Sequence, residues 1–99
     1  MKRVAVLSAI LENPDSCQQP FNAILSGFKG IVKGRMGLPL QEEDLAVISI
    51  VVIGDLDEIN ALTGKLGNIP NVTVKTSVAK KEILDSLQVE KSLQSEEKV

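Results

Sequence analysis

The chain has 99 residues, which fits one domain with a single hydrophobic core, and a formal net charge of −2. Such a balance lacks the clustered lysine and arginine needed to bind nucleic acid phosphates non-specifically. The chain has no histidine and one cysteine, Cys17. These counts exclude imidazole acid–base catalysis, Cys-His nucleophiles and a usual structural zinc site. A lone cysteine forms no internal disulfide, which favours a reducing cytoplasm.

The first predicted strand covers Arg3–Leu11, where nearly every residue is apolar, as in strands buried on both faces. This run is too short to span a bilayer and polar residues follow it, so we expect no signal peptide and no membrane association. Asn13 offers a helix N-cap and Pro14 suits the first helical position. The apolar stripe of a helix follows, comprising Phe21, Ile24, Leu25 and Phe28.

The second half of the chain predicts two strands, a helix and a last strand. A shorter, more polar strand is predicted over Ile31–Leu38, and Leu45–Ile53 is apolar at nearly every position. A helix over Asp55–Gly67 begins with a capping-box-like pair, and Val72–Ser77 alternates as a half-buried strand does. Glycine at Gly64 costs about 1 kcal/mol relative to alanine, so we expect a close helix contact to compensate.

The order strand, helix, strand, strand, helix, strand predicts an α+β fold, the ferredoxin-like βαββαβ sandwich. Right-handed crossovers place the four antiparallel strands in the order 4-1-3-2, with both helices on one face. The two strands that are apolar on both sides are then the central ones. We expect this domain to cover residues 1–78. We expect residues 79–99 to be a C-terminal extension, with a short helix containing Ile83, Leu84 and Leu87 followed by a disordered tail.

The predicted sheet has one face that its helices do not cover. Isoleucine, valine and leucine side chains would be exposed there over more than roughly 400 Å². Burying each of them is worth roughly 1.5–3 kcal/mol, which favours a homodimer or higher homo-oligomer through the sheet. The alternative is that the C-terminal extension folds back over this face, although it offers few apolar groups.

The segment Gly34-Arg35-Met36-Gly37 is the most unusual stretch and supplies candidate ligand-binding residues. Arg35, flanked by Gly34 and Gly37, could present its guanidinium to a carboxylate or phosphate. At Asn13, free amides of the helix start could hold the carboxylate of a small effector. The alternatives are that the glycines shape an edge strand with a solvated Arg35, and that Asn13 simply caps the helix.

Other sequence features give weaker indications. Thr63-Gly64-Lys65 lacks the spacing and context of a phosphate-binding loop. Consecutive acids at 42–44 could bind a hard cation but are usually only solvated. Cys17 lies in the first turns of the predicted helix, where its pKa could be lowered, but no partner residue supports a redox role.

Four segments occur in order at the spacing of a known family: Val32–Pro39, Ile48–Val52, Glu58–Gly67 and Val72–Thr76. Together they resemble the iron-only hydrogenase system regulators, over roughly residues 3 to 78. The resemblance implies an ACT-like ferredoxin fold, similar to the effector-binding domain of the nickel-responsive repressor. It also implies oligomers assembled through the sheet. The role it implies is regulatory, with transcriptional regulation as one form, and is linked to iron-only hydrogenase maturation or expression.

The sequence departs from the nickel-binding relatives in two respects. It has no histidine, so their metal site does not carry over, and we expect no metal ion and no cofactor. It shows no ribbon-helix-helix segment, so we expect a partner, rather than this chain, to contact DNA.

We therefore expect a non-catalytic regulatory module that senses a small effector at a subunit interface, near Asn13 and Arg35. The alternative is a structural protein–protein interaction module with no small-molecule ligand. Catalysis is disfavoured because titratable groups suited to neutral pH are missing.

Overall fold

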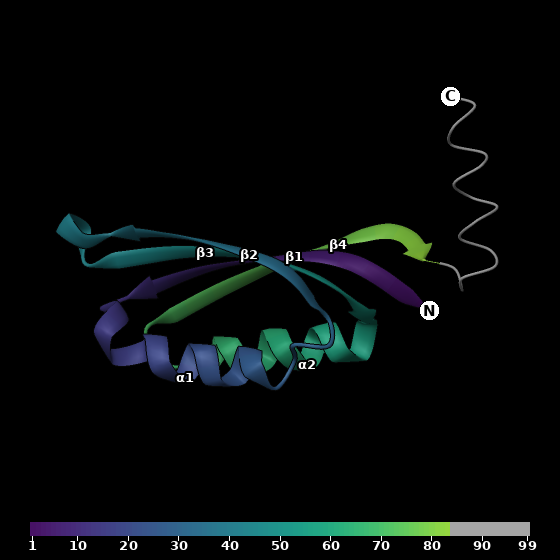
Figure 1. The fold of residues 1–99 in the computed structure, drawn as a ribbon, viewed down its shortest axis with the longest axis horizontal. Coiled ribbons are helices and arrows are strands. Elements are labelled where there is room, and N and C mark those ends of the chain that lie inside the picture. Colours follow the sequence, from purple (N-terminus) through teal and green to yellow (C-terminus); the bar gives the residue numbers. More distant parts are fainter. Residues whose placement is uncertain (84–99) are drawn as a thin grey trace, which may run out of the picture.

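The computed structural model describes residues 1–83 and forms one antiparallel sheet with both helices on the same side (Figure 1). The strands are β1 (Lys2–Glu12), β2 (Val32–Leu40), β3 (Leu45–Asp55) and β4 (Val72–Ile83). The helices are α1 (Pro14–Ser26) and α2 (Leu56–Gly67), and the short 3-10 helix η1 (Gln41–Glu43) joins β2 to β3.

The sheet has the strand order β2-β3-β1-β4. This is the predicted spatial order, and the ferredoxin-like α+β fold is confirmed. The central strands β1 and β3 pair along their whole length, from Lys2 opposite Asp55 to Glu12 opposite Leu45. Because these strands are apolar on both faces, the centre of the sheet presents hydrophobic side chains to its two sides.

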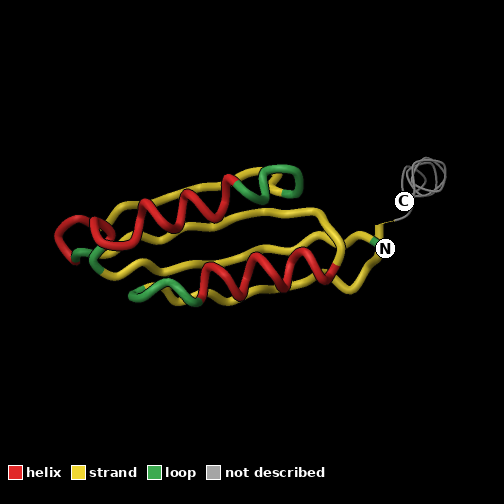
Figure 2. Tube along the Cα trace, turned by 90° about the horizontal axis from the view of Figure 1, so that it is seen from below, coloured by secondary structure: helices red, strands yellow, loops and turns green. Residues whose placement is uncertain are grey.

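The hydrophobic core lies between the sheet and the two helices, which run side by side across it (Figure 2). Alternate residues of β1 and β3 point into this layer, as the period of two in a strand requires. The largest fully buried side chains come from β1, β3 and both helices: Phe21, Leu7, Leu11, Ile50, Ile59, Leu62, Leu66, Val52 and Cys17. The predicted helix stripes therefore supply the core.

The opposite side of the sheet is covered by no helix within residues 1–83 (Figure 1). We call it the open face, and its central part includes Val6, Ser8, Ile10, Met36, Leu38, Val47, Ser49 and Val51. Its apolar side chains are exposed by 36% at Val6 and by as much as 73% at Met36. The expected exposed apolar surface is thus present in the described part of the chain.

Strand β4 is longer than the sequence indicated. It continues to Ile83, which pairs with Lys2, whereas we expected the strand to end at Ser77. Ile83 is therefore in a strand and not in the predicted short helix, because β1 begins early enough to offer it a pairing partner. The rest of the predicted C-terminal extension, including Leu84 and Leu87, lies outside the described residues.

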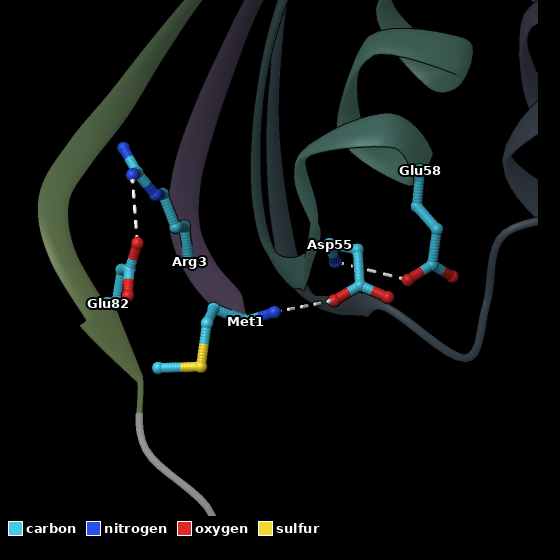
Figure 3. A network of polar contacts seen from close by, with 5 residues as sticks. All are labelled: Met1, Arg3, Asp55, Glu58 and Glu82. Carbon is cyan, nitrogen blue, oxygen red and sulfur yellow. Dashed lines mark hydrogen bonds and ion pairs between the residues drawn. The ribbon is translucent and has the colours of Figure 1, made fainter.

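Polar contacts join the ends of β1, β3 and β4 to the start of α2 (Figure 3). Arg3 pairs with Glu82 at 3.3 Å, and the amino group of Met1 lies 3.7 Å from the Asp55 carboxylate. Asp55 also begins α2 through the predicted capping box, in which its backbone N–H donates to Glu58 Oε1 at 3.1 Å. This corner therefore ties the N-terminus to the end of β3.

The close helix contact expected at Gly64 is absent. A Cβ added there would meet no atom within 4 Å. Glycine therefore lowers the helix propensity at this position, although the packing leaves room for a larger side chain. Gly54, at the end of β3, differs, because a Cβ there would lie 3.0 Å from Ile31 Cγ2.

We predict that Gly64→Ala raises the free energy of unfolding by about 0.5–1 kcal/mol, since alanine favours the helix and meets no obstacle. Gly54→Ala should lower it, because Ile31 would have to move. Urea unfolding followed by circular dichroism measures both changes. A less stable Gly64→Ala chain would contradict the open environment described for this position.

Candidate ligand-binding groove

One end of the molecule is built from three residues with left-handed backbone conformations, Asn13, Asp44 and Asn71, whose φ angles are 51°, 54° and 71°. Asparagine and aspartate tolerate this region better than other side chains do. Main-chain hydrogen bonds join the three positions, from the Asn13 N–H to the Asp44 carbonyl at 3.0 Å and from the Glu12 N–H to the Asn71 carbonyl at 2.8 Å. The junction of β1 and α1 is thereby held between the starts of β3 and β4.

Asn13 lies at the N-cap of α1, as predicted, but its side chain makes no capping hydrogen bond. The cap is instead built on its carbonyl, which accepts from the Ser16 backbone N–H at 2.9 Å and from Ser16 Oγ at 2.8 Å. The predicted side-chain cap is therefore wrong, because the left-handed turn at Asn13 directs the main chain into the helix.

A groove lies beside this junction, between the first turns of α1 and the hairpin of β2 and β3. Its volume is about 340 Å³, within the range of small-molecule sites. Pro39 and Ala46 form part of its wall and pair with each other across β2 and β3. Ala46 also pairs with Leu11, which is buried under the helices. Pro39 and Ala46 therefore lie on the helix side of the sheet. The polar lining comprises Asp15, Gln18, Gln41 and Asp44.

The structure separates the candidate residues of β2 onto two sides of the sheet. Arg35 and Gly37 pair with the buried Ile50 and Ile48, so both lie on the helix side, on the same strand face as Pro39. Gly34 pairs with Val51 and lies on the open face, beside a register shift in the strand. Arg35 and Gly37 are thus in line with the groove, and Gly34 is not.

The side chain of Arg35 crosses from β2 to α1, where Nη1 donates to Asn22 Oδ1 at 3.0 Å. Its other guanidinium N–H groups make no hydrogen bond to residues 1–83 and remain available. Strand β2 is also an edge strand, as the alternative interpretation of the glycines expected. Arg35 therefore combines a structural contact with free donors on the helix side of β2, outside the lining of the groove.

The polar residues that line the groove were not predicted as contacts of a small effector. Asp44 was considered only among the consecutive acids that could bind a hard cation, and no binding role was predicted for Asp15 or Gln18. Within the described residues, no group of three acidic or cysteine side chains is arranged to hold a metal ion. Sequence spacing could not have found the groove, because it depends on how far the hairpin extends past α1.

Cys17 is fully buried at the start of α1 and is 1% exposed. Burial raises the pKa of this thiol, and a hydrogen bond involving Ser16 only partly offsets the effect. The Sγ atom lies 3.6 Å from the Glu12 carbonyl oxygen, to which it donates weakly. The lowered pKa considered from the sequence is therefore wrong, because desolvation outweighs the helix start.

Comparison with known proteins identifies a family for this sequence and fold. The family model described as "TM1266-like: Iron-only hydrogenase system regulator, putative" matches residues 3–76. The chain belongs to this family. The structure of the uncharacterized protein TM1266 from Thermotoga maritima is 38% identical, with a TM-score of 0.78, over 81% of this chain and 100% of that one.

More distant structures share the fold alone. An unknown protein from Galdieria sulphuraria is 16% identical, with a TM-score of 0.57, over 86% of this chain and 49% of its own. SnoaB, a cofactor-independent oxygenase from Streptomyces nogalater, is 13% identical, with a TM-score of 0.51, over 87% of this chain and 99% of its own. No curated protein sequence matches. Among residues 1–83, no helix has the length and apolar character to cross a membrane.

We predict that Cys17 in the native chain is alkylated by iodoacetamide at pH 8 at least about 100-fold more slowly than in 8 M urea, because the buried thiol stays protonated and inaccessible. Mass spectrometry over a time course measures the modified fraction. Equal rates in the two conditions would contradict the burial of this side chain.

Proposed function

We propose that this chain is a non-catalytic regulatory module of an iron-only hydrogenase system that binds a small effector in the groove between α1 and the β2–β3 hairpin. The observation that carries the proposal is that successive side chains of β2 lie on alternate faces of the sheet. Arg35, Gly37 and Pro39 lie on the groove side, whereas Met36 and Leu38 lie on the open face. An effector that shifts this strand therefore changes both surfaces together.

The charges around the groove define the class of effector. The carboxylates of Asp15 and Asp44 line the groove, whereas Arg35 lies outside its lining, farther along the same face of β2. Strand geometry places Pro39 roughly 13 Å along β2 from Arg35. A small molecule with a carboxylate or phosphate directed at Arg35, and with hydrogen-bond donors toward the acidic end, matches this arrangement.

Two further parts of the proposal concern assembly and location. Strand β2 is an edge strand, so a second copy that approaches this edge would border the groove and place the effector at a subunit interface. The single buried thiol, Cys17, suits a reducing cytoplasm.

A role in transcription would place DNA contact on a partner protein. The formal net charge is −2, and the cations Lys2 and Lys75 lie on the open face at separate positions, opposite Asp55 and Ser8 respectively. Such a surface lacks the basic patch expected of a DNA-binding domain.

The test is a thermal-shift screen with amino acids, nucleotides and divalent metal ions. We expect at least one of the anionic compounds to raise the melting temperature of the wild-type chain. Arg35→Ala should weaken that binding about 10- to 100-fold, since a charge-assisted hydrogen bond contributes about 1.5–3 kcal/mol.

Lys80→Ala is the matched control, because it removes one positive charge from β4 at the other edge of the sheet. Its ligand affinity should equal that of the wild type. If no compound stabilises the chain, or if Arg35→Ala binds as well as Lys80→Ala, the groove is not the effector site. The former result would favour the alternative, a structural interaction module without a ligand.

A further inference from the structure

The open face carries most of the large hydrophobic side chains that are exposed within residues 1–83. They form rows across the strands, with Ile10 opposite Val47 and Val6 opposite Val51. One cation, Lys75 on the edge strand β4, lies between these two rows. An occupant of the face must therefore bring aliphatic side chains together with an acidic group.

Strand β4 leads the chain to one end of this face. Its last residue, Ile83, pairs with Lys2, and both lie on the open face. A bulge precedes this pair, because three residues of β4, 79–81, stand opposite Val4 alone. A bulge bends its strand, and Figure 1 shows the end of β4 on the side away from the helices. Residues 84–99 therefore begin beside the open face.

We propose that residues 84–99 fold back along the open face of their own chain and cover it, so that the face becomes available only when this segment is released. The family model ends at residue 76, so the covering segment lies outside the domain that defines the family. This inference does not rest on the proposed effector, because the groove lies on the other side of the sheet.

The segment is long enough to cross the apolar rows. Lys2 and Ile10 are eight positions apart on β1, which is roughly 26 Å at 3.3 Å per residue. Sixteen residues span about 24 Å as a helix and up to roughly 53 Å when extended. In either conformation the segment can run from Ile83 to the row of Ile10 and Val47.

The segment also has the apolar side chains that the face requires. Its aliphatic residues recur every two to four positions, at Leu84, Leu87, Val89 and Leu93. Contact between these side chains and the apolar rows removes hydrocarbon surface from water on both sides, which favours docking.

The charges of the segment and of the face are complementary. The segment contains four acids and two lysines, a balance of −2. On the face, Lys2 and Lys75 are exposed, and neither belongs to an ion pair within residues 1–83. The acids Glu12 and Asp55 lie at the two ends of the face, and Asp55 lies 3.7 Å from the amino group of Met1. Near the apolar rows an acid of the segment therefore meets a cation.

A second copy of the chain is the competing occupant. A segment tethered at Ile83 is present at its own face at an effective concentration of about 1 mM, as for other short connections. A second copy reaches that concentration only in a millimolar solution. At micromolar concentrations the tether therefore favours the segment over a second copy of equal intrinsic affinity.

The first experiment follows trypsin cleavage after Lys91 in the full chain by mass spectrometry, because docking protects this peptide bond. We expect Ile10→Glu to speed the cleavage at least about 10-fold, since a carboxylate within an apolar row disfavours docking. Leu56→Glu is the matched control, because both residues are 43% exposed and Leu56 lies on α2, on the other side of the sheet. It should leave the rate unchanged, and circular dichroism verifies that both variants are folded.

A charge reversal tests the complementarity directly. Lys75→Glu should speed cleavage after Lys91 about 3- to 5-fold, the effect expected for an exposed ion pair. Lys29→Glu makes the same change of charge just after α1 and should not alter the rate. Equal rates in the two variants would contradict a contact between the segment and Lys75.

The second experiment identifies the surface and the chain that the segment contacts. A photoreactive benzophenone amino acid replaces Leu87 in the full chain, and equal amounts of ¹⁵N-labelled and unlabelled chains are mixed before illumination. We expect cross-links to peptides of β1 and β3, with both cross-linked peptides carrying the same isotope.

Three results would overturn the proposal. Cleavage after Lys91 that is as fast in the wild type as in Ile10→Glu would show that the segment does not cover the face. Cross-links that join labelled to unlabelled chains would assign the contact to a second copy. Cross-links to α1 or α2 would place the segment on the other side of the sheet. The thermal-shift screen is scored separately, so failure here does not decide the effector proposal.

Discussion

The pairing of β1 with β3 is the interaction on which the rest of the structure depends. The two strands stay in register over their full length, and both carry apolar side chains on each face. One face is buried by α1 and α2 and forms the core. The other remains exposed within the described residues, with Val6 at 36% and Ile10 at 43%. The pairing of these two strands thus supplies core side chains on one face of the sheet and the exposed apolar side chains of the open face on the other.

The hairpin of β2 and β3 connects the two sides of the sheet. Arg35 reaches Asn22 on the helix side, and the next residue, Met36, lies on the open face. Because a strand alternates its side chains, a displacement of β2 acts on both surfaces. The hydrogen bond from the Asn13 N–H to the Asp44 carbonyl holds the start of α1 against this hairpin. The proposed regulatory role depends on this arrangement.

Part of the candidate site could be predicted from the sequence. Glycines on both sides of Arg35 indicated an unusual strand, and the register shift beside Gly34 bears this out. The separation of Gly34 from Arg35 also follows from strand periodicity, although which residue faces the helices depends on pairing with β3. That Asp15 and Asp44 both line the groove could not be predicted. Asp15 lies at the start of α1 and Asp44 in the β2–β3 hairpin, and only the folded chain brings these two distant segments together.

The sequence by itself determined the order of the elements and the fold, because hydrophobic periodicity, glycine and proline positions and the Asp55 capping box are local signals. It also identified the central strands, since only they are apolar on both faces. Tertiary structure alone decided the extension of β4 to Ile83, the burial of Cys17 and the groove. Each of these depends on which distant segments come into contact, and no local pattern encodes that information.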